Sequence, residues 1–289
     1  MSDPEDPCLA DPRSPFAIII AANNEEGYIG PCLDALLAQD DAAGAMRVIV
    51  AANACTDATC AEAAARSAGF AARGSRLEIL EIAEPGKLNA LNRAERGLAA
   101  EQARAFLDAD VLCDPELIGQ IRAALAPDRP LYASGTLAVR LARTWVTRRY
   151  AGLWARLPFV EGGAVGAGFF AVNGPGRARW GAFPAIISDD TFVRLNFAPS
   201  ERIEVPARYH WPMVEGFARL TTVRRRQNAG VDELRRLYPG LMDNEGKARL
   251  TRGRLLWLAL SRPVDLAVYL AVHVAVRRKP PATDWSRGR

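Results

Sequence analysis

Short apolar runs alternate with helix-like patterns along the first half of the chain. The runs have the length of strands and lie at 16–20, 47–50, 77–80 and 105–107. Between them, large aliphatic residues recur every three or four positions, as on one face of a helix, at 29–37 and 88–98. Strands that alternate with helices predict an α/β fold with a mostly parallel, Rossmann-like sheet flanked by helices.

The pattern changes after residue 130. Segments 131–139 and 169–172 have the composition of further strands, and from about residue 215 the chain becomes helical and basic. We therefore predict three parts: a disordered, acidic and proline-broken tail at 1–15, an α/β domain at 16–230, and a helical, basic C-terminal extension at 231–289.

Polar clusters directly follow three of the predicted strands, at 23–26, 53–57 and 108–110. Ligands of open parallel sheets gather at the carboxyl ends of the strands. We therefore expect these clusters to meet at one edge of the sheet, where a nucleotide would bind.

The strongest chemical signal is the pair Asp108 and Asp110, which ends the apolar run at 105–107. In an extended strand, residues two positions apart leave the backbone on the same side, so both carboxylates would point at one place. Their mutual repulsion favours a bound cation, and a divalent metal held by one or two carboxylates and by substrate phosphates suits such a site. An acidic turn without a ligand is the structural alternative.

Two further carboxylates, Glu25 and Asp57, follow the first and second predicted strands. Carboxylates accept hydrogen bonds from ribose hydroxyls and base N–H groups, although Asp57 also suits helix capping. Lys87 lies at the predicted start of a helix, where a cation is unfavourable unless an anion binds there. A solvated lysine remains the alternative.

Ser188, Asp189 and Asp190 open another predicted helix. A serine N-cap followed by acids complements the helix dipole, and one of these carboxylates could equally act as a general base. Further on, Arg224, Arg225 and Arg226 form either a solvated helix face or a set of donors to a diphosphate. Acyl-transfer spacing and Walker-type loops are absent from the sequence.

Charge is distributed unevenly along the chain. The formal net charge is +4, but residues 201–289 carry net +9 and the first 200 carry net −5. A basic end with apolar segments favours an anionic membrane surface as a partner. No recognition motif points to nucleic acid, so we expect none to bind.

The C-terminal stretch 255–276 is largely apolar but is interrupted by polar residues, and its clean part at 266–276 is too short to span a bilayer. We expect a helix that lies on an anionic leaflet; a core or oligomer helix and a true span are the alternatives. Five cysteines and no apolar leader within residues 1–15 favour a reducing, cytoplasmic setting, peripheral to the inner face of the cell membrane.

Taken in order, the clusters resemble family 2 glycosyltransferases, which have the glycosyltransferase A fold. The resemblance spans about residues 16–230 and rests on five stretches, Ile19 to Glu26, Asn53 to Thr59, Gly86 to Asn92, Leu107 to Asp110, and Ser188 to Asp190. It implies that Glu25, Asp57 and Lys87 hold the nucleotide. It also implies that Asp108 contacts the ribose or the metal, and that Asp110 ligates Mg²⁺ or Mn²⁺ on the donor diphosphate.

The same resemblance makes Asp190 the catalytic base and puts Asp189 where a glutamate is more usual. Segment 166–170 falls where the family lines the sugar and acceptor pocket. Two positions depart from the family pattern, Ala21 for a frequent proline and Asn23 for a frequent aromatic residue. Gln227 and Asn228 replace the Arg-Trp ending of processive synthases, which favours the transfer of a single sugar.

We therefore predict a metal-dependent, inverting transfer of one sugar from a nucleotide-diphosphate sugar to an acceptor hydroxyl. The acceptor would be lipid-linked or part of a cell-envelope glycan. Two alternatives are a sugar-phosphate nucleotidyltransferase and a non-catalytic sugar- or lipid-binding module. The first lacks its glycine- and arginine-rich loop here, because an acidic segment stands at 21–26. The sequence predicts no oligomeric state.

Overall fold

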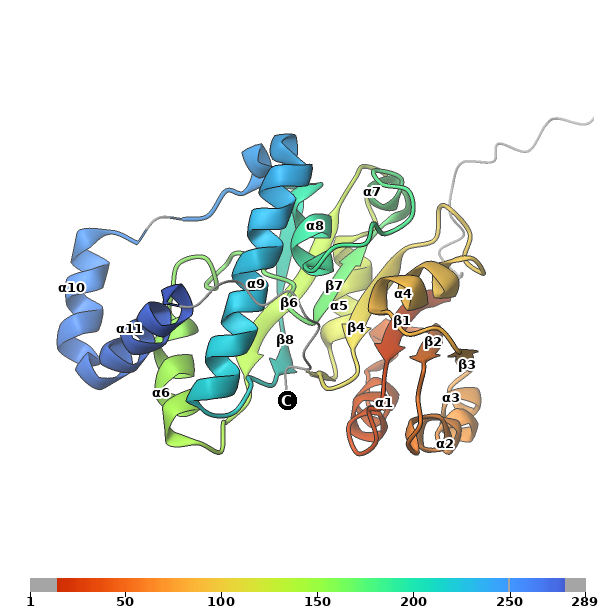
Figure 1. Cartoon of the computed structure of the whole chain (residues 1–289). Coiled ribbons are helices and arrows are strands. Elements are labelled where there is room, and N and C mark those ends of the chain that lie inside the picture. The colour runs from red at the N-terminus through yellow and green to blue at the C-terminus, as the bar shows by residue number, and fades with distance from the viewer. Residues whose placement is uncertain (1–14, 249, 279–289) are drawn as a thin grey trace, which may run out of the picture.

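A computed structural model describes residues 15–248 and 250–278 (Figure 1). Its centre is an eight-stranded sheet with the order β3-β2-β1-β4-β7-β6-β8-β5. The strands are β1 Phe16–Ala22, β2 Met46–Asn53, β3 Arg76–Ile82, β4 Arg104–Asp108, β5 Leu112–Cys113, β6 Tyr132–Val139, β7 Phe169–Val172 and β8 Arg202–Trp211. The predicted tail at 1–15 lies outside the described residues except for Pro15.

Helices cover both faces of this sheet. The α-helices are α1 Ile29–Leu37, α2 Thr59–Ala64, α3 Ser67–Ala72, α4 Lys87–Glu95, α5 Leu117–Ala124, α6 Trp145–Trp154, α7 Gly174–Arg177, α8 Asp189–Leu195, α9 Phe217–Leu237, α10 Arg252–Ser261 and α11 Pro263–Arg277. Three short 3₁₀ helices are η1 Asp41–Ala43, η2 Pro199–Glu201 and η3 Pro239–Asn244.

Six of the eight strands run in the same direction. β3, β2, β1 and β4 pair in parallel, β7 is antiparallel to both β4 and β6, and β6 pairs in parallel with β8. The short β5 is antiparallel to β8. The predicted mostly parallel α/β sheet is therefore confirmed.

The core lies on both faces of the sheet, as β1 illustrates. Ile18 and Ile20 point to one face and pack in a cluster with Leu33 of α1. Ile19 points to the other face and packs in a cluster with Leu91 of α4. Because helices cover both sides, β1 is apolar along its whole length and does not alternate with polar residues.

A third hydrophobic cluster joins the C-terminal helices to the domain. Its members come from α6, α9 and α11 and from the segment after β8, and they include Tyr150, Trp154, Met213, Leu220 and Val272. The domain boundary predicted at residue 230 falls inside α9, so the division of the chain at that point stays a prediction.

The C-terminal stretch forms two helices, where the sequence suggested one. Within the described residues, no single helix is long and apolar enough to cross a membrane. Among the residues that the structure describes, only α10 and α11 taken together reach that length and apolarity, and the two helices are bent by 113° at the break between them.

Candidate active site

A cleft of about 800 Å³ lies at the carboxyl ends of the parallel strands, a size within the range of small-ligand sites. Ala21 at the end of β1, Asn53 at the end of β2 and Asp108 at the end of β4 all line it. Glu25, Lys87, Asp110, Asp189 and Asp190 line the same cleft. The expected meeting of separate polar clusters at one sheet edge is therefore observed.

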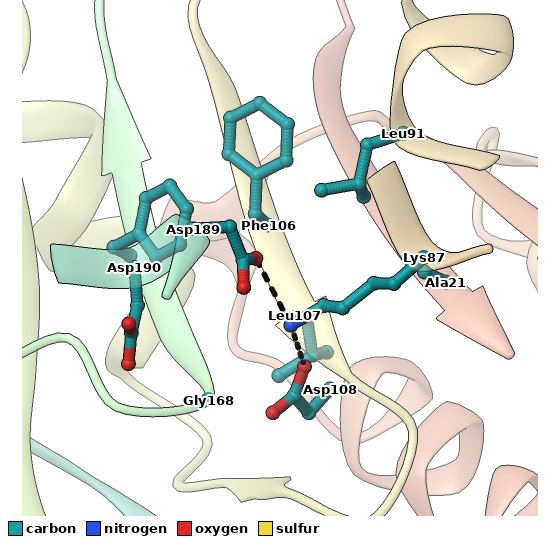
Figure 2. Close-up of a pocket in the computed structure, with 10 residues that line it drawn as sticks. Ala21, Lys87, Leu91, Phe106, Leu107, Asp108, Gly168, Asp189 and Asp190 are labelled. Carbon is teal, nitrogen blue, oxygen red and sulfur yellow. Dashed lines mark ion pairs between the residues drawn. The ribbon is translucent and has the colours of Figure 1, made fainter. Parts of the chain in front are cut away.

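Lys87 connects two of these clusters (Figure 2). Its Nζ lies 3.0 Å from an Asp108 oxygen and 3.0 Å from an Asp189 oxygen. Burial acts to lower the pKa of Lys87, but the two carboxylates outweigh it and raise the pKa above its usual range. The lysine therefore stays charged and holds β4 and α8 together.

The start of α4 places this lysine. Gly86 precedes α4 with φ of +139°, and its N–H donates to Asn53 Oδ1 at 3.0 Å. The Asn53 Nδ2 group donates in turn to the carbonyl of Ala22 at 2.8 Å. The buried Asn53 thus ties together the ends of β1 and β2 and the beginning of α4.

Asp189 and Asp190 are adjacent in the first turn of α8 but have different partners. Consecutive residues on a helix point about 100° apart, so only Asp189 reaches Lys87. The Asp190 carboxylate accepts from the backbone N–H of Thr191 at 2.6 Å. Burial and the charge of Asp189 raise the pKa of Asp190 to about 6, which suits a group that takes up a proton near neutral pH.

Asp108 and Asp110 reach the cleft by different routes. Asp108 is the last residue of β4, whereas Asp110 lies in the turn that follows. The strand geometry expected for both therefore applies only to Asp108, although the turn brings Asp110 to the same cleft. Burial and the charge of Asp108 raise the pKa of Asp110 to about 7, so this pair favours a bound cation.

Gly168 packs closely against this acidic pair. Its carbonyl accepts from the Asp108 N–H at 2.8 Å, and its φ is +77°. A Cβ there would lie 2.9 Å from Trp211 Cδ1 and 3.0 Å from Val111 Cγ2. Only glycine suits both the conformation and the space, so the glycine-rich segment before β7 shapes the cleft at this point.

The residues present fit a metal carried by a substrate. Asp108 and Asp110 supply carboxylate oxygens, which Mg²⁺ and Mn²⁺ prefer. The described part of the chain holds no group of three or more His, Cys, Asp or Glu placed to bind a metal. A metal here would need further oxygen ligands from phosphate and water, as Mg²⁺ commonly has.

Glu25 and Asp57 occupy different positions. Glu25 lines the cleft, but Asp57 does not lie on its wall. The Asp57 carboxylate instead accepts from the backbone N–H groups of Glu26 and Thr59, both at 3.1 Å. Burial acts to raise the pKa of Asp57. The hydrogen bonds from these N–H groups and from the Thr59 hydroxyl outweigh burial and lower the pKa. Asp57 thus ties the segment after β1 to the first residue of α2, and its role toward a nucleotide stays a prediction.

The three consecutive arginines at 224–226 of α9 do not form one cluster. Arg224 and Arg226 line the cleft. Arg225 points elsewhere, and its guanidinium donates to the carbonyls of Ala275 and Val276 at the end of α11. The structure therefore does not bring Arg225 to the nucleotide side, because neighbouring helix positions face different directions.

The opposite part of the cleft is apolar and was not identified from the sequence. Tyr150 and Trp154 of α6, Trp211 at the end of β8, and Met213 and Val223 line it. Trp154 and Trp211 pack with ring centroids 5.7 Å apart. Their aromatic character was visible in the sequence, but nothing local indicated that α6, β8 and α9 meet.

Solved glycosyltransferase structures share this fold. A mannosyltransferase from Pyrobaculum calidifontis in complex with GDP-Man and Mn²⁺ is 20% identical, with a TM-score of 0.55 over 96% of this chain and 80% of that one. Residues 1–349 of S. aureus TarS in complex with UDP are 14% identical, with a TM-score of 0.52 over 95% of both chains. At these identities the likeness concerns the fold alone.

Comparison with curated proteins gave no match. The family model described as glycosyl transferase family 2 matches residues 17–176, which is more than half of the chain. That range holds Lys87, Asp108 and Asp110 of the polar cleft wall, whereas Asp189 and Asp190 lie beyond it. With the family resemblance and the expected fold both confirmed, the chain belongs to glycosyl transferase family 2.

Proposed function

We propose that this glycosyltransferase transfers one sugar from a nucleotide-diphosphate sugar to an acceptor hydroxyl, with a divalent metal and with inversion at the anomeric carbon. The observation that carries this proposal is the convergence of Lys87, Asp108 and Asp189 with Asp190 at one cleft. The complexes of similar folds with GDP-Man and Mn²⁺ and with UDP support the donor class and the metal.

The donor would lie on the polar wall. Glu25 would accept hydrogen bonds from the nucleoside, and Asp57 would hold the loop beside it. Lys87, Arg224 and Arg226 would face the diphosphate, because cations stabilise phosphate oxygens. Asp108 and Asp110 would hold Mg²⁺ or Mn²⁺, which when bound neutralises charge on the diphosphate.

Asp190 would act as the general base. Its carboxylate would take the proton of the acceptor hydroxyl while that oxygen forms a bond to the anomeric carbon. The bond from that carbon to the diphosphate oxygen breaks, and the nucleoside diphosphate leaves with the electron pair. A single displacement inverts the configuration. Asp189 would position α8 through its contact with Lys87.

The apolar wall supports an acceptor with a hydrocarbon part, such as a lipid-linked sugar. Tyr150, Trp154 and Met213 offer apolar and aromatic surface that a purely hydrophilic glycan would not need. Gln227 and Asn228 after the arginines support the transfer of a single sugar over processive synthesis. We place the protein in the cytoplasm, peripheral to the membrane that carries such an acceptor.

An assay of nucleoside diphosphate release tests the proposal. UDP-Glc, UDP-GlcNAc and GDP-Man would be offered with Mn²⁺, with either an octyl glycoside or the free monosaccharide as acceptor. We expect release with one donor, faster with the octyl glycoside, and an inverted product by NMR. Retention of configuration would contradict the mechanism. Nucleotide binding without release in any combination would indicate a binding protein instead.

A further inference from the structure

Exposed apolar side chains are concentrated at the C-terminal end of the molecule. Of the thirteen large hydrophobic residues that are exposed in the described part of the chain, eight lie between Leu250 and Val274. Leu256 and Leu260 are 61% and 75% exposed. A concentration of exposed apolar side chains marks an interaction site more often than chance exposure.

Seven of these eight residues lie on the outer faces of α10 and α11, and Leu250 precedes α10. The inner face of α11 packs on α6 and α9 through Val272 and Val276, and Tyr269 stacks on Tyr150 at 5.2 Å. Val264, Leu270 and Val274 face outward on the same helix. In Figure 1 the two helices form the edge of the molecule farthest from β3.

α10 is the more exposed of the two helices. Leu255, Leu256, Trp257 and Leu260 are all exposed, and only Leu258 is buried. The sequence predicted one surface helix over 255–276, but this stretch forms α10 and α11, and α11 packs on the domain through its inner face. Because the inner face of α11 is buried against α6 and α9, α10 carries most of the solvent-exposed apolar surface.

Basic side chains outnumber acidic ones around this surface. Asp265 is the only acidic residue between 250 and 278, and it is 3% exposed. It pairs with Arg262 at 2.9 Å and with Arg149 at 3.5 Å. Arg252, Arg277 and Arg278 are exposed at the ends of the two helices. The half-exposed Glu161 pairs with Arg254 of α10 at 3.0 Å. The outer faces are therefore apolar, with an excess of cations at their margins.

We propose that the outer faces of α10 and α11 dock on the surface of an anionic lipid bilayer, with Leu256 and Leu260 of α10 inserted among the acyl chains. Apolar side chains flanked by arginines match an anionic headgroup layer over hydrocarbon. A symmetric pair of copies would instead bring the same arginines together. The two short helices, bent by 113°, lie on a surface more readily than they cross it.

Vesicle flotation of the full chain tests this proposal without nucleotide or metal, so its outcome is separate from that of the transfer reaction. The vesicles contain phosphatidylcholine with or without phosphatidylglycerol. We expect the wild type to float with the anionic vesicles, less with neutral ones, and less at high salt. The double variant Leu256→Gln, Leu260→Gln should bind about tenfold more weakly, because two leucines no longer insert.

A matched control is Leu237→Gln at the end of α9, where the leucine is 49% exposed but lies outside both helices. This variant should float like the wild type, and all variants should melt at similar temperatures because the changed residues are exposed. Equal flotation of the double variant and the wild type would overturn the proposal. The proposal would also be overturned if neither protein floated and sedimentation equilibrium showed a dimer for the wild type but a monomer for the double variant.

Discussion

The two walls of the cleft are built in opposite ways. The polar wall is a set of charges fixed by short contacts, with Lys87 held 3.0 Å from carboxylates of both β4 and α8. The apolar wall is a packed surface of rings and aliphatic groups that continues into the cluster beneath α11. The first can recognise a charged donor by a few directed contacts. The apolar wall can hold an acceptor through non-directional contact over a large area, so it tolerates acceptors of different shape.

The largest expected effect falls on the polar wall. Replacing Asp110 by asparagine removes a charge from the pair proposed to hold the metal, and kcat/KM should fall by about 10³-fold, since metal-assisted charge stabilisation amounts to several kcal/mol. Steady-state assays over a range of Mn²⁺ concentrations measure this. Asp114→Asn is the control, because Asp114 pairs with His210 and does not line the cleft. A loss smaller than tenfold would assign the metal elsewhere.

The next effect separates the two acids of α8. Asp190→Asn should lower kcat by about 10²-fold or more with donor KM unchanged, since a positioned base contributes on that scale. Asp189→Asn removes the charge of one of the two carboxylate partners of Lys87 and should raise the donor KM more than it lowers kcat. Initial rates with varied donor distinguish them. The opposite pattern would exchange their roles.

The pH profile tests the same base by a different measurement. Because the pKa of Asp190 is raised to about 6, its carboxylate is the minor form below that pH. At saturating metal, kcat/KM should therefore fall about tenfold for each pH unit below about 6. The residual activity of Asp190→Asn should lack this inflection. An inflection unchanged in that variant would show that another group titrates.

The smallest effect concerns the apolar wall. Val223→Ala removes two methyl groups from a side chain that lines the cleft, and should raise the KM for an octyl glycoside about fivefold, from about 1 kcal/mol of lost apolar contact. The donor KM and the KM for a free monosaccharide should not change. Leu237→Ala on the same helix, outside the cleft, is the control. If the KM for the octyl glycoside and the KM for the free monosaccharide rose equally, the hydrocarbon part of the acceptor would bind to another surface.

Local pattern was enough for most of the fold. Each predicted strand is present, and the central strands β1, β4 and β7 contain continuous apolar runs because both of their faces are buried. β5 was missed because two residues carry no periodicity. β8 was missed although Ile203, Val205 and Tyr209 alternate with polar residues. Pro206 interrupts the pattern where the pairing with β6 shifts register after Gly135.

The polar wall was also largely predictable, because its residues directly follow strands or begin helices. Asp57 shows the limit of prediction from sequence. A carboxylate at this position can bind a ligand or accept hydrogen bonds within the loop, and only its contacts in the structure distinguish the two roles. Arg225 shows another, because adjacency in sequence is not adjacency on a helix. The apolar wall depends on three distant segments meeting, and no local signal encodes that.

The stack of Tyr150 on Tyr269 has a practical meaning for protein engineering. A shortened chain that ends after α9 would lose more than its outer helices, because Tyr150 would lose the ring that supports it from behind. Removal of α10 and α11 would thus disturb the apolar wall of the cleft together with the proposed lipid-docking surface. Point changes on the solvent side of α10 are the cleaner way to obtain a detached yet active enzyme.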